Sequence, residues 1–260
     1  MTDVIVADHR AAPVQLAIET TGRHGSLAIL RGNLVLESIN LPKTTRTAAT
    51  LAVHLDQILA QHRSGTRRLD LISIADGPGS FTGLRIGVTT AKSLGYALKI
   101  PLVSVDSLAA IAATTFQDHP EAVSVCVGLD AYRGQIYSGC FHRQELLPPQ
   151  NQLSPLWTPH PPQTQVLDSQ GWSRHLSKIG QGEKRLTENV IPMPRNWLNT
   201  GDERPFREAG LDWLERSCDA IGVGLLGWRA YQLGQTIDPL KLMPRYLKPS
   251  AAEEQANQQI

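Results

Sequence analysis

Residues 74–87 read Ile-Ala-Asp-Gly-Pro-Gly-Ser-Phe-Thr-Gly-Leu-Arg-Ile-Gly, and this stretch decides the fold expected for the chain. It follows the apolar run 69–74, which has the length and composition of a buried strand. It also opens a segment with helical spacing that extends to about Leu98. The sequence therefore predicts a buried strand, a glycine-rich turn and a helix over 69–98.

Such a turn can hold a ligand. Backbone N–H groups at a helix start, reinforced by the helix dipole, bind phosphate. The usual phosphate loop ends in Gly-Lys-Ser/Thr, whereas Gly83 is followed here by Leu84 and Arg85, so the lysine that would reach the phosphates is missing. If the turn does bind a ligand, the loop residues are Gly77, Gly79, Ser80 and Thr82.

The same glycines can instead let another backbone approach closely. Gly83, Gly87, Ala91 and Gly95 are four residues apart and form a stripe of small side chains along one side of the helix. Each helical glycine costs about 1 kcal/mol relative to alanine, and a flat face that packs closely would compensate. We expect this stripe to make room for a neighbouring molecule.

The first half of the chain alternates strands and helices. Strands are predicted at 14–20, 25–30, 34–39, 69–75 and 100–105. A helix is predicted from Thr44 or Thr45 to about His62, and Asp106 or Ser107 can cap another helix after the last strand. The apolar face of the 44–62 helix is widened by Ala49, Val53 and Ala60, so we expect this helix to bury two sides.

A second, weaker unit begins at residue 122. Two strands are predicted at 123–129 and 134–141, followed by a proline-rich span at 148–162 that is neither helix nor central strand. Helical spacing returns in parts of 166–177, a strand end and turn are expected at 178–182, and helices are expected at 208–220 and 222–234. Residues 242–249 are expected to be extended.

This order of elements is typical of a two-lobed α/β protein with the actin-like ATPase, or ribonuclease H-like, fold. The expected division is a loose leader at 1–13, an N-terminal domain at 14–118, a reduced C-terminal domain at 119–250 and a loose tail at 251–260. Right-handed crossovers place the glycine turn at the carboxyl ends of the strands, where such sheets bind ligands.

Composition points to an ordinary protein of the reducing cytoplasm. The net charge is +1, so no strong field directs the whole molecule to nucleic acid or a membrane. The 3 cysteines lack a Cys-x-x-Cys spacing, which argues against a disulfide framework or a zinc knuckle. Residues 1–13 lack the apolar core of a secretory signal, and no run reaches the roughly 18 apolar residues of a membrane span.

Four segments of the chain carry a family resemblance. They are the stretch 77–87 with Ala91-Lys92-Ser93-Leu94, and the segments 16–21, 129–137 and 244–248. The first resembles the signature of the TsaB family, the YeaZ-like subunits of the bacterial tRNA threonylcarbamoyladenosine machinery, and the others follow in the family's order. Two features depart from the family: Arg46-Thr47 stands where many members have His-Ser, and the leader and proline-rich span have no clear counterpart.

The resemblance implies a non-catalytic subunit that pairs with the catalytic subunit TsaD through helices of its first domain, with TsaE joining as an ATPase. The complex transfers a threonylcarbamoyl group to the adenosine at position 37 of tRNAs that read ANN codons. The chain itself is expected to need no cofactor, with ATP or ADP and Mg²⁺ held in the complex, and to form a homodimer when alone. Its expected partner interface comprises Ala49, Val53, Gly83, Arg85, Gly87, Thr90, Ala91 and Leu94.

An enzymatic alternative rests on three acids. Glu19, Asp76 and Asp130 each lie at a predicted strand end, where an actin-like ATPase or phosphotransferase places carboxylates around Mg²⁺. Such acids also cap helices or accept turn N–H groups. No two of the 8 histidines are four residues apart, so a helical metal-binding histidine pair is not expected, and the predicted catalytic and metal residues are none.

The remaining polar residues near the turn are expected to have structural roles. Ser80 and Thr82 are natural helix caps rather than nucleophiles. Arg85 is disfavoured by the dipole at a helix start, so we expect it to meet Asp76 or a carboxylate of a partner. The basic loop Arg63, Arg67 and Arg68 is either solvated or in contact with tRNA.

Overall fold

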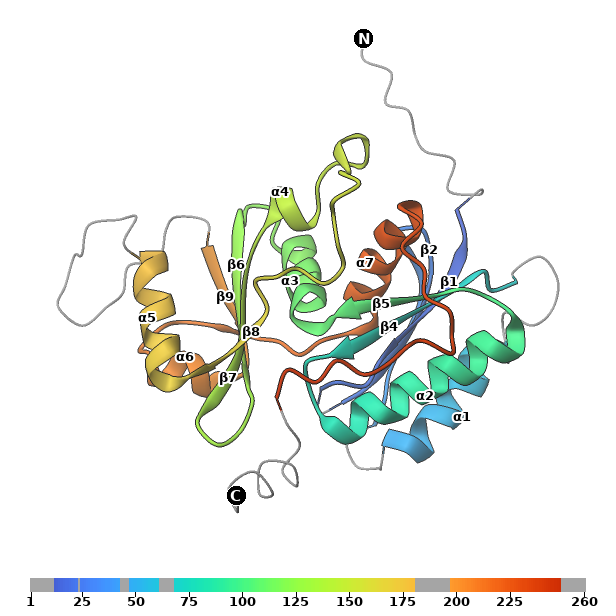
Figure 1. Ribbon diagram of the computed structural model, residues 1–260, viewed down its shortest axis with the longest axis horizontal. Coiled ribbons are helices and arrows are strands. Elements are labelled where there is room, and N and C mark those ends of the chain that lie inside the picture. The colour runs from blue at the N-terminus through green and yellow to red at the C-terminus, as the bar shows by residue number, and fades with distance from the viewer. Residues whose placement is uncertain (1–11, 23, 43–46, 61–67, 181–196, 249–260) are drawn as a thin grey trace, which may run out of the picture.

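Two five-stranded sheets lie side by side, each with helices against it (Figure 1). The computed structural model describes residues 12–22, 24–42, 47–60, 68–180 and 197–248. The expected leader at 1–13, the loop arginines Arg63 and Arg67, and the tail at 251–260 lie largely or wholly outside these residues.

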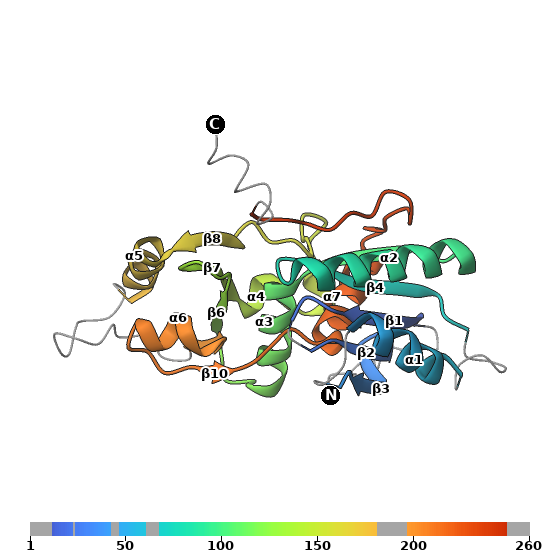
Figure 2. The ribbon, with the colours of Figure 1, turned by 90° about the horizontal axis from the view of Figure 1, so that it is seen from below.

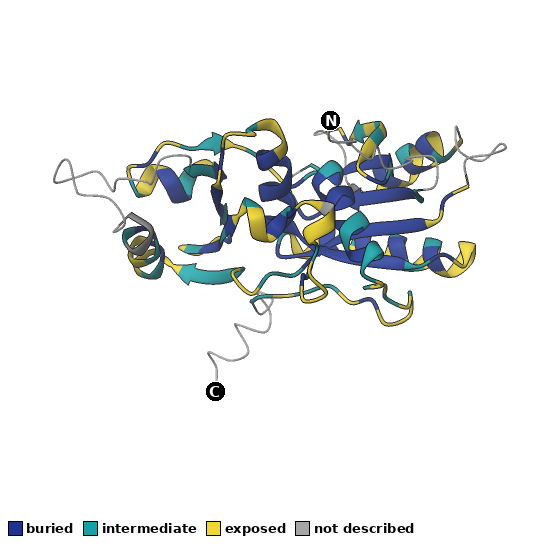
Figure 3. Ribbon diagram, turned by 90° about the horizontal axis from the view of Figure 1, so that it is seen from above, coloured by how far each residue is buried: buried dark blue, intermediate teal, exposed yellow. Residues whose placement is uncertain are grey.

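The first sheet has the strand order β3-β2-β1-β4-β5. Its strands are β1 (Val14–Glu19), β2 (Ser26–Arg31), β3 (Leu34–Asn40), β4 (Leu71–Gly77) and β5 (Leu102–Asp106). β1, β2 and β3 form an antiparallel meander, and β4 and β5 continue from β1 in parallel. Except for the edge strand β3, these strands are buried (Figure 3).

The second sheet repeats this pattern in the order β8-β7-β6-β9-β10. Its strands are β6 (Ser124–Asp130), β7 (Gln135–His142), β8 (Gln165–Asp168), β9 (Trp197–Gly201) and β10 (Leu214–Glu215). Again three antiparallel strands are followed by two parallel ones. The two-lobed α/β arrangement predicted from the sequence is therefore confirmed.

Helices cover both faces of the first sheet (Figures 1 and 2). α1 (Thr47–Ala60) and α2 (Phe81–Leu98) pack on one face, and α3 (Ser107–Asp118) and α7 (Ala220–Gln232) on the other. The alternation of strand side chains produces this double layer: Leu16 and Ile18 join the α1–α2 core, while Ala17 between them faces the α3–α7 core. The latter core continues into the second lobe through α3.

The second lobe carries smaller helices. They are α4 (Arg143–Leu146), the 3₁₀ turn η1 (Gln150–Gln152), α5 (Ser169–Gly180) and α6 (Glu203–Glu208). The turn expected at 178–182 is wrong in its first residues, because α5 runs to Gly180. The helix expected at 208–220 is also wrong: α6 ends at Glu208, and the short strand β10 follows.

The division into two successive domains does not describe the packing. α7 belongs to the expected C-terminal domain by sequence, yet it packs on β1, β2, β4 and β5 of the first sheet. The segment after α7 also returns to this lobe, since Leu242 is buried in the α1–α2 core. The first lobe is thus completed by residues from the C-terminal part of the chain.

Candidate functional site on the first lobe

The glycine turn between β4 and α2 packs against the end of β1. A side chain at Gly83 would overlap the carbonyl oxygen of Thr20, and a Cβ at Gly79 would lie 2.5 Å from the carbonyl oxygen of Thr21. The N–H of Ser80 donates to that Thr21 oxygen at 2.7 Å, and the Ser80 hydroxyl accepts from the N–H of Gly83 at 3.2 Å. The expected cap is confirmed, and these glycines admit a backbone segment of the chain itself.

The stripe of small residues on α2 faces inward, contrary to our expectation. Gly87 lies against Thr20 and Ile74, Ala91 is fully buried, and Gly95 lies against Leu102. The small side chains let α2 lie close to the sheet, so the stripe serves internal packing. Of the expected partner interface, Gly83, Gly87 and Ala91 are therefore wrong, because no partner can reach them.

The outward faces of α1 and α2 carry the other expected interface residues. Arg85 is exposed on α2, and Thr90 and Leu94 are half-buried there. On α1, Ala49 is exposed and Val53 has 55% of its surface exposed. The two helices contact each other, so these residues belong to one continuous helical layer.

Helix α1 is apolar on the side that the chain covers, whereas its outer side mixes small apolar residues with exposed Asp56 and Gln57. Leu51, Leu55 and Ile58 are buried in the core beneath the helix. On the outer side, Ala52 and Ala60 are exposed together with Ala49 and Val53. The second buried side predicted for this helix is thus not buried within the described part of the chain.

Arg85 does not pair with Asp76. Its guanidinium carbon lies 3.9 Å from the centre of the Phe81 ring, and its Nε donates to the hydroxyl of Tyr246 at 3.1 Å. The expectation of an Asp76 partner is wrong because Asp76 lies buried at the end of β4, whereas Arg85 points outward from α2. An exposed cluster of Phe81, Arg85 and Tyr246 results at the start of α2.

Glu19, the last residue of β1, is engaged by the turn that follows the strand. Oε1 of Glu19 accepts hydrogen bonds from the N–H of Thr21, from the Thr21 hydroxyl at 2.6 Å and from the N–H of Gly22 at 3.0 Å. The side chain is fully buried, and this burial raises the pKa of Glu19 to about 7. Oε2 of Glu19 is buried without a hydrogen-bond partner among the described residues.

The acids at the carboxyl ends of β4 and β5 meet side chains from two distant segments. Nε2 of His160, in the proline-rich span, lies 3.0 Å from both carboxylate oxygens of Asp76. Arg245 donates to Asp106 and to the carbonyl oxygen of Gly77, and its backbone N–H donates to the carbonyl oxygen of Asp76. The proline-rich span and the C-terminal segment together close the carboxyl edge of the first sheet.

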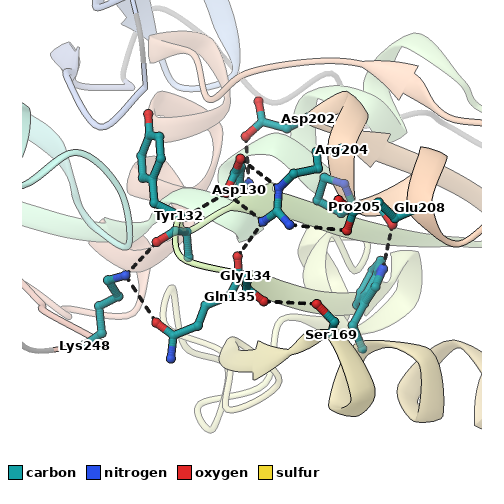
Figure 4. Close-up of polar contacts among 12 residues, drawn as sticks. Asp130, Tyr132, Gly134, Gln135, Ser169, Asp202, Arg204, Pro205, Glu208 and Lys248 are labelled. Atoms are coloured by element: carbon teal, nitrogen blue, oxygen red, sulfur yellow. Dashed lines mark hydrogen bonds and ion pairs between the residues drawn. The ribbon is translucent and has the colours of Figure 1, made fainter.

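The acid after β6 is held by an arginine of α6 (Figure 4). Arg204 binds both carboxylate oxygens of Asp130, with Nε–Oδ2 at 2.9 Å and Nη2–Oδ1 at 2.7 Å. Lys248 donates to the carbonyl oxygen of Ala131 at 2.6 Å. Because Glu19, Asp76 and Asp130 all have partners within the chain, the enzymatic alternative gains no support from their geometry.

Sequence reasoning missed the partners of these acids. His160, Arg204 and Arg245 lie 84, 74 and 139 residues from Asp76, Asp130 and Asp106, respectively. Among the described residues, none of the helices combines the length and apolar character needed to cross a membrane.

Comparisons with known proteins agree with the motif at 77–87. Residues 44–147 match the family model of TsaD, tRNA N6-adenosine threonylcarbamoyltransferase. The TsaB protein of Bacillus subtilis is 36% identical over 149 residues, which cover 55% of this chain and 63% of that protein. The TsaB protein of Haemophilus influenzae is 31% identical over 122 residues, which cover 47% of this chain and 51% of that protein. The chain thus spans about half to two thirds of the length of these relatives.

The fold is shared with a solved YeaZ structure. YeaZ from Pseudomonas aeruginosa superposes with a TM-score of 0.66 at 20% identity, covering 90% of this chain and all of that one. A second structure, described as an uncharacterised protein with similarity to the peptidase YeaZ from the same organism, gives a TM-score of 0.68. The chain is thus similar in sequence to TsaB proteins and shares its fold with YeaZ.

Proposed function

We propose that this protein is an accessory subunit in the synthesis of threonylcarbamoyladenosine at position 37 of tRNA, and that it acts by pairing with a TsaD-type catalytic subunit. The names of its relatives, tRNA threonylcarbamoyladenosine biosynthesis proteins, support the pathway. The match of residues 44–147 to the TsaD model supports a shared ancestry with the catalytic subunit.

The uncovered apolar side of α1 is the observation that carries the pairing. Val53, with 55% of its surface exposed, is flanked by exposed Ala49 and Ala52 on a helix whose opposite side is already in the core. Exposed apolar residues that gather on one helix surface are typical of a site where a second protein binds. Neighbouring α2 contributes Arg85, Thr90 and Leu94 to the proposed contact.

The proposed role is non-catalytic. Asp76 is in hydrogen-bond contact with His160, Asp130 forms an ion pair with Arg204, and Ser80 is used as a helix cap. The proposal includes no cofactor for this chain alone; ATP or ADP and Mg²⁺ are assigned to the assembled complex, together with TsaE and tRNA. We also propose that the protein works in the cytoplasm and that, without TsaD, the same helical face pairs two copies into a homodimer.

The pairing is tested by Val53→Arg. A charged side chain in an apolar contact loses its hydration without gaining a partner, so the affinity for TsaD of the same organism should fall at least about tenfold. Val123→Arg is the matched control, because Val123 has 51% of its surface exposed and lies next to β6 in the other lobe. Affinity is measured by calorimetry, and tRNA modification by a reconstituted reaction with each subunit omitted in turn.

Equal affinity of both variants for TsaD would contradict the proposed face. Hydrolysis of Mg-ATP by the purified chain alone, lost on Asp130→Ala, would instead favour the nucleotide-using enzyme. Sizing of the chain with and without TsaD shows whether homodimer and heterodimer compete, as a shared face requires.

A further inference from the structure

Two cysteines of the second lobe face each other across neighbouring strands. Cys126 on β6 and Cys140 on β7 are directly opposite in the antiparallel register. Such pairs have Cβ atoms about 4.5–5.5 Å apart, and a disulfide needs about 3.5–4.5 Å. The two Sγ atoms already lie 2.7 Å apart. A small movement of the strands therefore suffices to join them.

A histidine completes the cluster. Nε2 of His175, on α5, lies 3.3 Å from Sγ of Cys140. The indole of Trp172, one turn earlier on α5, stacks beside the imidazole with ring centres 6.1 Å apart. The histidine is thus held at the sulfur by the packing of its own helix.

The two thiols differ in environment. Cys140 is half-buried, whereas Cys126 is fully buried in the same core cluster of this lobe as Phe206. Hydrogen bonding with Cys126 and with His175 lowers the pKa of Cys140 to about 6, and burial raises the pKa of Cys126 well above its usual range. Cys140 is therefore the better nucleophile at neutral pH.

We propose that Cys126 and Cys140 form a reversible dithiol–disulfide pair, with Cys140 as the attacking thiolate, Cys126 as the resolving thiol and small-molecule disulfides such as oxidised glutathione as the oxidant. The Cys140 thiolate attacks one glutathione sulfur and expels a glutathione thiolate, which takes up a proton. Cys126 then loses its proton and attacks the Cys140 sulfur, expelling the second glutathione. The protein loses two electrons and two protons, and the glutathione disulfide gains them as two thiols.

A shared metal ion fits the sulfur positions less well. The three ligand atoms of Cys126, Cys140 and His175 lie within 4.8 Å of one another. Two thiolates on one tetrahedral zinc, at about 2.3 Å each, are separated by about 3.8 Å. The observed 2.7 Å is well short of this separation and favours a bond between the sulfurs.

The test uses the full chain, reduced, desalted and then equilibrated with oxidised and reduced glutathione in varying ratio. Free thiols should fall from the 3 cysteines of the sequence to one, with loss of the mass of two hydrogens and a linked peptide pair containing Cys126 and Cys140. Excess reductant should restore all thiols. Cys218→Ala should behave as the unchanged protein, because Cys218 is buried elsewhere, in the core of the first lobe and α3.

Single variants separate the two roles. Cys126→Ala should stop at a mixed disulfide of Cys140 with one glutathione, whereas Cys140→Ala should not react. In His175→Ala, less of Cys140 should be thiolate at pH 7, and the greater nucleophilicity of that thiolate only partly offsets this loss. The variant should therefore oxidise a few-fold more slowly at pH 7, and its oxidation rate should keep rising at higher pH. Circular dichroism of each variant before oxidation confirms that it is folded.

Three results would overturn the proposal. The first is that all thiols stay free under conditions that oxidise a solvent-exposed dithiol. The second is that oxidation links Cys218 instead of the Cys126–Cys140 pair. The third is that the chain, incubated with zinc chloride and desalted, retains one zinc per chain and keeps both thiols reduced under the same oxidant.

Discussion

Glu19 shows how the environment of one residue sets the behaviour of a carboxyl group. Its side chain is fully buried at the end of β1, with one oxygen accepting from Thr21 and Gly22 and the other without a partner among the described residues. Burial outweighs these hydrogen bonds and raises the pKa of Glu19 to about 7 from 4.5. The folded protein therefore binds this proton more tightly than the unfolded chain does.

A pH-dependent stability follows. The charge on Glu19 begins to cost stability as the pH rises above 4.5, and the cost is complete above about 7. The shift corresponds to about 3 kcal/mol for a fully buried group. Glu19→Gln should keep the turn hydrogen bonds and remove the charge, so its gain in stability over the unchanged protein should grow between pH 5 and pH 8. Urea denaturation of the variant and of the unchanged protein at both pH values measures this difference in stability.

Glu145→Gln controls for the loss of one negative charge, because Glu145 is an exposed side chain. If the stability of Glu19→Gln changes with pH as much as the stability of the unchanged protein does, the buried carboxyl does not set the pH dependence.

Single residues were predictable where their partner is close in sequence. The caps Ser80 and Asp106 were each one of two candidates predicted from the sequence, and each accepts from an N–H three residues later. The partner of Arg85 was not, because Tyr246 lies 161 residues away. The pairing of Cys126 with Cys140 was also missed, because it depends on the register of two strands.

Among the elements, α2 was predicted best in extent and worst in orientation. Its limits, Phe81–Leu98, match the sequence prediction. Small residues four apart show that a helix has a close-packing side, but the spacing does not tell whether a sheet of the same chain or another protein lies against it. Here the end of β1 occupies that side.

Gly83→Ala tests this orientation. Alanine is the better helix former by about 1 kcal/mol, yet its Cβ would overlap the Thr20 carbonyl, so we expect a net loss of about 2 kcal/mol or more. Ser93→Ala, on the exposed side of the same helix, should change stability by less than about 0.5 kcal/mol. Thermal melting compares the two variants. A Gly83→Ala protein as stable as the Ser93→Ala protein would place the stripe outside the core.

The errors at 208–220 have a local cause. Proline is tolerated in the first turn of a helix, so α6 begins before Pro205 rather than after it. Gly210, with φ at +67°, lies just beyond the end of this helix. Pro205 and Gly210 were both visible in the sequence. The apolar spacing that follows them was given more weight and led to the wrong helix.

At the scale of the whole molecule, the C-terminal segment holds the first lobe together. Residues 236–248 contain no helix or extended strand, yet Leu242 is buried in the α1–α2 core and Arg245 bonds Asp106. The contiguous domains expected from the sequence failed here, because periodicity within a segment does not reveal the lobe on which that segment packs.

Leu242→Ala measures this contribution. Removing a side chain that is 1% exposed should cost about 2–5 kcal/mol. Leu240→Ala is the control two residues earlier, with 67% of its surface exposed and an expected change below about 0.5 kcal/mol. Urea denaturation should separate the two variants clearly. Equal stabilities would mean that the segment lies on the lobe without stabilising it.

The position of α7 constrains the order in which the protein can form during synthesis. The strands of the first sheet leave the ribosome early, but the helix that covers one of their faces, Ala220–Gln232, emerges only after all strands of the second sheet. Until then Ala17, Ala28 and Leu71 form part of an unprotected apolar surface. Nascent chains shorter than about 232 residues are thus the species that most need a chaperone.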